Sequence, residues 1–166
     1  LNSIKYNRTC NNFKMLILGF LTGFVLNGFC ATVAILHGDI KLTFYKFEIV
    51  NLILLFIVVF IQSSSEELIF RGFIYQRLKN RYKNTEFAII INSILFALLH
   101  LGNNGISAFG FIDILLSGVF FSLMFCAFDS IWLVMARHST WNFTQNILLG
   151  LPNSGTISKY SLFMMD

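Results

Sequence analysis

Five long apolar stretches, separated by short polar segments, limit what this chain can fold into. Only 12% of the 166 residues are charged, whereas soluble domains contain about 25%, so too few charged groups are present to cover a water-exposed surface. A membrane-spanning helix needs about 20 mostly apolar residues. The sequence therefore predicts an all-α, polytopic bundle of about five transmembrane helices. The predicted spans are residues 15–36, 47–61, 87–101, 109–128 and 131–151, and the second continues as a helix to residue 78.

The apolar stretches show no sign of β-structure or of a second domain. They lack the alternation of lipid-facing and lumen-facing residues that an outer-membrane barrel needs. No internal repeat or linker is visible, so residues 1–166 are predicted to form one transmembrane domain with a motif-bearing core at about 47–151. The net charge of +4 is small and scattered, which indicates no nucleic-acid partner. Because the chain begins with Leu1 rather than methionine, we expect a longer natural N-terminus with room for a further span.

Lysine and arginine residues predict how the helices are oriented in the membrane. Short cytoplasmic loops are enriched in these residues, and here they gather before the first span and between the second and third. The segment GNNGISA after the third span contains none. We therefore expect an integral protein of the bacterial cytoplasmic membrane, whose site opens toward the cytoplasm. The residues concerned are Lys5, Arg8 and Lys14 before the first span, and Arg77, Lys79, Arg81 and Lys83 after the second.

A small set of ionisable side chains lies within the predicted spans. Such groups cost several kcal/mol in hydrocarbon unless they are paired or line a wet cavity, and by default they mark function. The set therefore contains the candidates for a functional site. Its members are Glu66, Glu67, Arg71, His100, Asp113, Arg137 and His138.

Helical spacing sorts several of these residues into groups. Glu67 and Arg71 are four residues apart, so they share a helix face in the order that favours an ion pair, and we interpret them as a positioning pair. Glu66 points about 100° away from Glu67 and has no cation in its own helix. His138 and Asn142 are also four residues apart, which places an imidazole and a carboxamide on one face.

Four polar side chains are predicted to lie at similar depths in the membrane. Counted from the predicted cytoplasmic ends at about 1.5 Å per helical residue, Glu66 and Asn142 lie about 16 Å deep, His100 about 21 Å and His138 about 10 Å. Groups that are far apart in the sequence thus converge inside the bundle.

This set of side chains suits the activation of water. A carboxylate between apolar helices binds a proton tightly, so Glu66 can accept one from water, and an imidazole can hold or share it. A histidine and a carboxamide that donate to one point, such as His138 and Asn142, can stabilise an oxyanion. In proteases, each such donor raises the reaction rate by about 10²- to 10³-fold. Alternatively, Glu66, His100 and His138 bind a divalent metal, with zinc as the expected ion, and leave a position for water. Both chemistries fit hydrolysis of a peptide bond.

Three short strings resemble the motifs of a known family. The strings EELIFRG at 66–72, FALLH at 96–100 and HSTWN at 138–142 are similar to the ordered motifs EExxxR, FxxxH and HxxxN of the CPBP family of intramembrane proteases. This family includes the type II CAAX prenyl endopeptidases and the bacterial Abi proteins linked to bacteriocin self-immunity and peptide maturation. The resemblance covers about residues 47–151 and places each motif on a predicted membrane helix.

The resemblance implies an intramembrane endopeptidase, of metallo- or glutamate type, and gives each candidate a role. Glu66 would be the catalytic carboxylate, and His100 would be its partner on the water or the metal. His138 and Asn142 would form the oxyanion site, or His138 would bind the metal. The substrate would be a membrane-associated protein or peptide.

The composition bears on the substrate and leaves other functions open. It is rich in Phe, Ile, Asn and Lys, as is typical of AT-rich bacterial genomes, where CAAX prenylation is not expected. We therefore expect a peptide precursor, a pheromone or a bacteriocin-related substrate. A non-catalytic immunity or interaction protein of the same fold is the main alternative, and a proton-coupled carrier fits less well because no internal repeat is present. Asp113 and Arg137 belong to no motif, and we expect them to form a structural pair or to snorkel to an interface.

Overall fold

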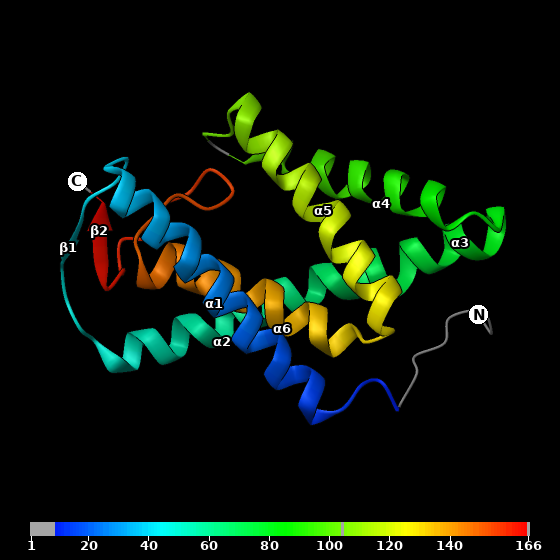
Figure 1. Cartoon of the computed structure of the whole chain (residues 1–166), viewed down its shortest axis with the longest axis horizontal. Coiled ribbons are helices and arrows are strands. Elements are labelled where there is room, and N and C mark those ends of the chain that lie inside the picture. Colours follow the sequence, from blue (N-terminus) through cyan, green and yellow to red (C-terminus); the bar gives the residue numbers. More distant parts are fainter. Residues whose placement is uncertain (1–8, 104, 166) are drawn as a thin grey trace.

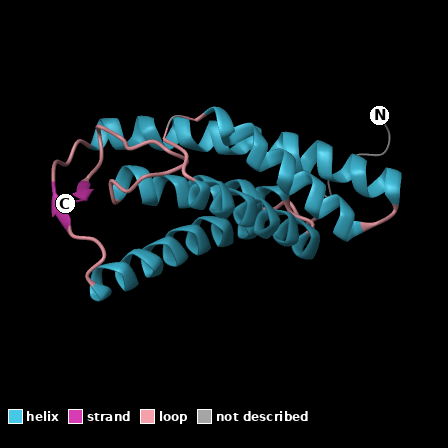
Figure 2. Cartoon of the chain, turned by 90° about the horizontal axis from the view of Figure 1, so that it is seen from above, coloured by secondary structure: helices cyan, strands magenta, loops and turns pink. Residues whose placement is uncertain are grey.

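A computed structural model describes residues 9–103 and 105–165, and most of this part is helical (Figure 1). Two short strands, β1 (Leu42–Phe44) and β2 (Phe163–Met165), pair antiparallel at one end of the bundle (Figure 2). The helices η1 and η3 are π-helices and η2 is a 3₁₀-helix. The helical elements are α1 (Phe13–His37), α2 (Ile49–Glu67), η1 (Leu68–Tyr75), α3 (Gln76–Tyr82), α4 (Thr85–Leu99), η2 (His100–Gly102), α5 (Ala108–Phe128), α6 (Ile131–Asn142) and η3 (Phe143–Leu148).

The structure confirms the all-α, polytopic fold, with one difference at the last predicted span. In the described part of the chain, four helices are long and apolar enough to cross a membrane: α1, the continuous helix from α2 through α3, α4 with η2, and α5. The fifth stretch is helical only to Leu148 and is not among them. Its polar residues lower its hydropathy, and most of α6 is buried among other helices. The chain is thus an integral membrane protein in which α6 is covered mainly by protein.

Side-chain caps define where the helices begin. Asn12, Asn84, Ser107 and Ser130 each accept a hydrogen bond from a backbone N–H three residues later, at the starts of α1, α4, α5 and α6. Such caps satisfy amide groups that lack a partner in the first helical turn. Gly38 ends α1 in the left-handed conformation that glycine adopts without steric cost.

Two glycines allow α1 to approach α6 closely. A Cβ atom at Gly19 would lie 2.4 Å from the carbonyl oxygen of Leu133, and one at Gly23 would lie 2.6 Å from that of Arg137. Small residues four apart are a common means of close helix packing in membranes. The sequence analysis did not use this pattern, although it allows α6, which carries His138, to pack closely against α1.

A single methyl group at this contact is expected to destabilise the protein. We expect Gly19→Ala to lower the free energy of unfolding by about 2 kcal/mol, because the new Cβ overlaps the α6 backbone. Unfolding of the detergent-solubilised protein measures this change. The matched control is Gly28→Ala on the same helix, where a Cβ meets no atom within 4 Å. Equal stability of the two variants would contradict this view of the contact.

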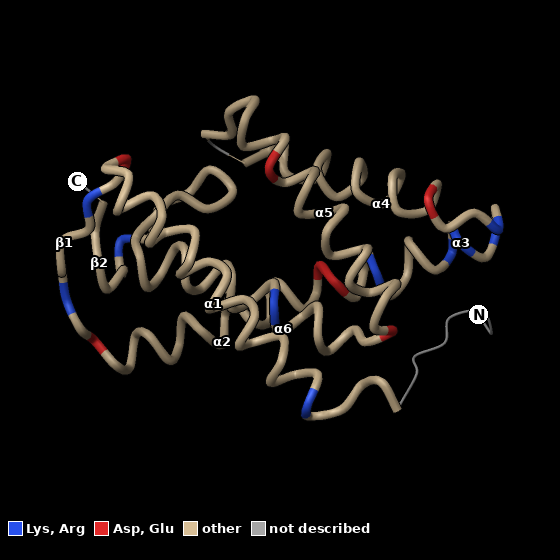
Figure 3. Tube along the Cα trace, in the orientation of Figure 1, with Lys and Arg blue, Asp and Glu red and all other residues tan. Residues whose placement is uncertain are grey.

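Charged residues of the loops lie at both ends of the bundle (Figure 3). Basic residues gather at α3 and its connection to α4, which lies at the opposite end of α4 from the connection to α5. Two of the residues used to predict orientation, Lys5 and Arg8, lie outside the described part. The orientation itself stays a prediction. The other end carries Lys41, Lys46 and Lys159.

Candidate active site

The last turn of α2 meets the ends of α4 and α6 at three ionisable side chains. The Oε2 atom of Glu66 lies 3.9 Å from Nε2 of His100 and 4.0 Å from Nε2 of His138. Both histidines are buried, and the Glu66 side chain is 18% exposed. The convergence expected from helical depth is therefore present in the folded chain.

Three residues of the site, Glu66, His100 and Asn142, lie where an α-helix changes its winding, whereas His138 lies within α6. Glu66 lies one residue before the last residue of α2, which passes into the π-helix η1. Asn142 is the last residue of α6 and is followed by the π-helix η3, whereas His100 begins the 3₁₀-helix η2. Short π-helical segments inside helices occur frequently at functional sites. The sequence analysis predicted continuous helices here and missed these changes.

The carbonyl group of Phe96 orients His100. Nδ1 of His100 lies 2.8 Å from this oxygen, one helical turn earlier. A carbonyl oxygen can only accept, so Nδ1 carries the proton and donates it. In the neutral ring, Nε2 is therefore a hydrogen-bond acceptor, and this is the nitrogen closer to Glu66. The Phe96 ring also packs against the imidazole, with centroids 4.8 Å apart, which gives a physical reason for the first residue of the string FALLH.

Glu67 orients His138 in the same way. Nδ1 of His138 lies 2.7 Å from Oε1 of Glu67, and Nη1 of Arg71 donates to the same oxygen at 3.0 Å. An ionised carboxylate can only accept hydrogen bonds, so Nδ1 of His138 carries a proton and donates it to this oxygen. The ring of Phe121 stacks on the imidazole with centroids 4.7 Å apart. Glu67 thus connects the Arg71 ion pair to the orientation of His138, a link that spacing alone did not reveal.

Arg71 contacts α2, α4 and α5 within the bundle. Besides Glu67, its guanidinium donates from Nη2 to the carbonyl oxygen of Gly118 at 2.9 Å, and it lies 4.5 Å from the ring centroid of Phe96. The side chains of Arg71 and Glu67 are fully buried. The predicted ion pair is therefore present and ties α2 and η1 to the backbone of α5.

Two further polar contacts involve Gln62 and Ser63, which the sequence analysis missed. Gln62, one turn before Glu66, donates from Nε2 to Oε1 of Glu66 at 3.3 Å. Asn142 donates to Oγ of Ser63 through a long bond of 3.4 Å. The spacing of four residues between Gln62 and Glu66 was the available signal, since such pairs share a helix face.

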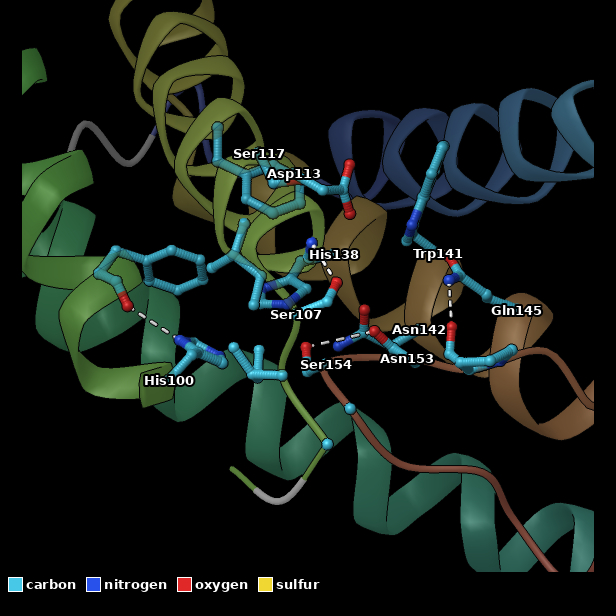
Figure 4. A pocket seen from close by; sticks show the side chains of 18 residues that line it. His100, Ser107, Asp113, Ser117, His138, Trp141, Asn142, Gln145, Asn153 and Ser154 are labelled. Carbon is cyan, nitrogen blue, oxygen red and sulfur yellow. Dashed lines mark hydrogen bonds between the residues drawn. The ribbon is translucent and has the colours of Figure 1, made fainter. Parts of the chain in front are cut away.

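A cavity of about 180 Å³ lies beside this cluster (Figure 4). His100, His138 and Asn142 line it, whereas Glu66 borders it through the two imidazoles. The other walls come from α5 and from two loops, residues 105–107 and 152–155. These loops lie at the end opposite to the basic α3–α4 connection, so they belong to the side that the charge pattern assigns to the exterior. The side from which the cavity is entered stays a prediction.

Asp113 and Arg137 behave differently from the expectation. Among the described residues they form no ion pair with each other or with any third group. Arg137 is buried rather than snorkelling, and its guanidinium lies 4.2 Å from the ring centroid of Phe120 and 5.2 Å from that of Trp141. Asp113 lies on α5, is exposed and lines the cavity. The aromatic rings enclose the cation, which keeps it from reaching either an interface or a carboxylate.

The types of donor atom in the cluster fit a divalent metal, but the distances between these atoms are longer than a zinc site requires. Two imidazole nitrogens and a carboxylate are common zinc ligands, and both Nδ1 atoms are oriented by acceptors, as in many zinc sites. Zinc bonds of about 2.1 Å place neighbouring ligand atoms about 3.4 Å apart, whereas Oε2 of Glu66 is 3.9 and 4.0 Å from the nitrogens. In the described part of the chain, no three His, Cys, Asp or Glu side chains are grouped to hold a metal ion. A metal at this cluster therefore stays a prediction.

Comparison with known proteins supports the resemblance carried by the three motifs. The family model described as type II CAAX prenyl endopeptidase Rce1-like matches residues 48–144, which contain all three strings. No curated protein and no solved structure matches the chain. Since the family match covers more than half of the 166 residues, the chain belongs to the family of type II CAAX prenyl endopeptidase Rce1-like proteins.

Proposed function

We propose that this protein is an intramembrane endopeptidase that activates water at Glu66. One observation carries the proposal: Oε2 of Glu66 lies at nearly equal distances, 3.9 and 4.0 Å, from Nε2 of two buried histidines. These separations exceed a direct hydrogen bond but suit a bridging water. Family membership supports a protein of the CAAX-protease type, and the spacing of Glu66 and the two histidines supports the proposal of a water bound between them.

The first step is attack of this water on a peptide carbonyl. Glu66 accepts a proton from the water as its oxygen forms a bond to the carbonyl carbon, and the carbonyl oxygen becomes an oxyanion. Gln62 holds the other carboxylate oxygen through its 3.3 Å hydrogen bond, which keeps Oε2 directed at the histidines. The fixed Nδ1–H of His100 leaves Nε2 to accept a hydrogen bond from the same water.

The second step breaks the bond between the carbonyl carbon and the amide nitrogen. The proton held by Glu66 passes to the leaving nitrogen, so that one water molecule is consumed and an amine and a carboxyl group are released. Asn142 can exchange its long bond to Ser63 for one to the oxyanion. His138 donates to the oxyanion from Nε2 when its ring holds a second proton, and Glu67 accepts from Nδ1 in both forms.

We infer the substrate class from the surroundings of the site. The site lies among membrane helices, so the scissile bond belongs to a membrane-associated protein or peptide. A bacterial peptide precursor in the cytoplasmic membrane remains our interpretation of the substrate. The metal alternative is distinguished by the metal content of the purified protein and by cleavage after chelation.

Isotope labelling tests the reaction and the role of His100 together. The purified chain in phospholipid vesicles is incubated with synthetic apolar peptides in H₂¹⁸O, and the products are analysed by mass spectrometry. We expect internal cleavage with one ¹⁸O atom in each new carboxyl group. His100→Ala is expected to lower the rate about 100-fold, because one partner of the water is lost.

The exposed His37, which is the last residue of α1, provides the matched control for this experiment. His37→Ala removes the same side chain far from the cluster and should leave the rate unchanged. New termini without ¹⁸O, or equal rates for the two histidine variants, would contradict the proposed reaction.

A further inference from the structure

The carboxylate of Asp113 is an unused charge in the wall of the active-site cavity. Asp113 lies on α5 and lines the cavity together with His100, His138 and Asn142. Within the described part of the chain it makes no hydrogen bond and no ion pair. Figure 4 shows its carboxylate turned toward Trp141 across the cavity. An ionisable group on a membrane helix is costly and by default marks function.

The other charges near the cavity leave Asp113 without a counterion. Apart from the two histidines, Asp113 is the only ionisable side chain among the described residues that line the cavity. Glu66, which belongs to the cluster beside the cavity, is also an acid. Arg137 is not among the lining residues, and the rings of Phe120 and Trp141 enclose its guanidinium. The cavity therefore presents negative charge and favours a cationic guest.

The helix geometry gives the separation, along α5, between this charge and the part of the cavity next to His138. Asp113, Ser117 and Phe121 are spaced four residues apart, so they follow one face of α5 toward the site, where Phe121 stacks on His138. Eight residues of helix rise about 12 Å, and an extended peptide covers that length in about four residues. The volume of about 180 Å³ accommodates a group the size of one side chain rather than a folded partner.

We propose that Asp113 forms a subsite for a cationic group of the peptide substrate, a lysine or arginine side chain or a free amino terminus, within about four residues of the scissile bond. This inference rests on the proposed protease function and adds the class of substrate that the cavity selects. The carboxylate contributes a charge-assisted hydrogen bond to an ammonium or guanidinium group. A carboxyl terminus or an acidic side chain at the same position is repelled.

A set of fluorogenic decapeptides tests this subsite. Each peptide has the same apolar sequence and carries one Lys, Gln or Glu at one position in turn. We expect the wild type to cleave Lys peptides with kcat/KM about tenfold above the Gln peptides when the Lys lies within four residues of the cut. Asp113→Asn should bring the Lys-to-Gln ratio close to one, and Asp113→Lys should shift the preference to Glu.

Asp129→Asn is the matched control, because it makes the same change at the other end of α5, outside this cavity. It should keep the preference for Lys. An Asp113→Lys protein that ranks Lys, Gln and Glu as the wild type does would overturn the proposal.

A separate binding measurement keeps the subsite distinct from the catalytic proposal. If the wild type cleaves none of the peptides, the protease function fails, and the subsite is then judged by binding alone. In a Trp132→Phe background, quenching of Trp141 fluorescence reports the Kd of the Lys peptide. A Kd about tenfold weaker in Asp113→Asn supports the subsite, and an unchanged Kd overturns it.

Discussion

Replacing Glu66 with glutamine is expected to reduce peptide cleavage by about a thousandfold. Glutamine has nearly the shape of glutamate and can still contact Gln62, but it cannot accept a proton from water. The two histidines and the cavity should remain in place, so the loss falls on the chemical step rather than on folding. The measurement is kcat/KM for one cleaved peptide, together with the unfolding transition of both proteins.

Glu48→Gln is the matched control for the Glu66 variant, since Glu48 directly precedes the other end of α2 and lies far along the helix from the cluster. We expect it to retain full activity. Equal cleavage by Glu66→Gln and the wild type would contradict the mechanism. If the Glu66→Gln protein instead protects cells from a bacteriocin as well as the wild type does, binding suffices and the non-catalytic immunity function is favoured.

The second large effect concerns stability and follows from the buried Glu67–Arg71 pair. Arg71→Met is expected to lower the free energy of unfolding by about 3–5 kcal/mol. The variant leaves the Glu67 carboxylate, which is fully buried, without its cation, and it removes the 2.9 Å bond to the carbonyl oxygen of Gly118. Chemical denaturation in detergent measures the change.

Two further variants separate the buried charge from the loss of a long side chain. Arg81→Met makes the same substitution at an exposed position of α3 and should change stability by less than about 0.5 kcal/mol. The double variant Glu67→Gln/Arg71→Met should be more stable than Arg71→Met alone, because no unpaired charge remains in the bundle. A double variant that is no more stable than the single one would show that the pair is not the source of the effect.

The helices were largely predictable because apolar length and polar punctuation are local properties. The predicted starts of the first four spans lie within two residues of helices in the structure. The last span was misjudged because length and hydropathy do not reveal what covers a helix. Most of α6 is buried in protein, through the contact of Gly19 and Gly23 with its backbone. The pairing of β1 with β2 joins residues 42–44 to 163–165, and no local pattern in either segment predicts this pairing.

The polar cluster shows the same division between spacing and tertiary contact. Helical periodicity predicts pairs within one element, so the Glu67–Arg71 pair was accessible from the sequence, and the contact of Gln62 with Glu66 had the same signal. Contacts between elements were not accessible. The hydrogen bond from His138 to Glu67 spans 71 positions, and the stacking of Phe121 on His138 joins α5 to α6.

By itself, the sequence determined that this protein is a membrane-embedded helix bundle of the CAAX-protease type. Hydropathy and the three ordered motifs are local properties, which can be recognised without knowing how the helices pack. Only the tertiary structure decided how the motif residues face one another, that Glu67 orients a histidine, and that Asp113 rather than Glu66 lines the cavity wall. The physical reason is that the tautomer of an imidazole and the partner of a carboxylate depend on neighbours within about 3 Å. In a bundle, these neighbours come from helices that are distant along the chain.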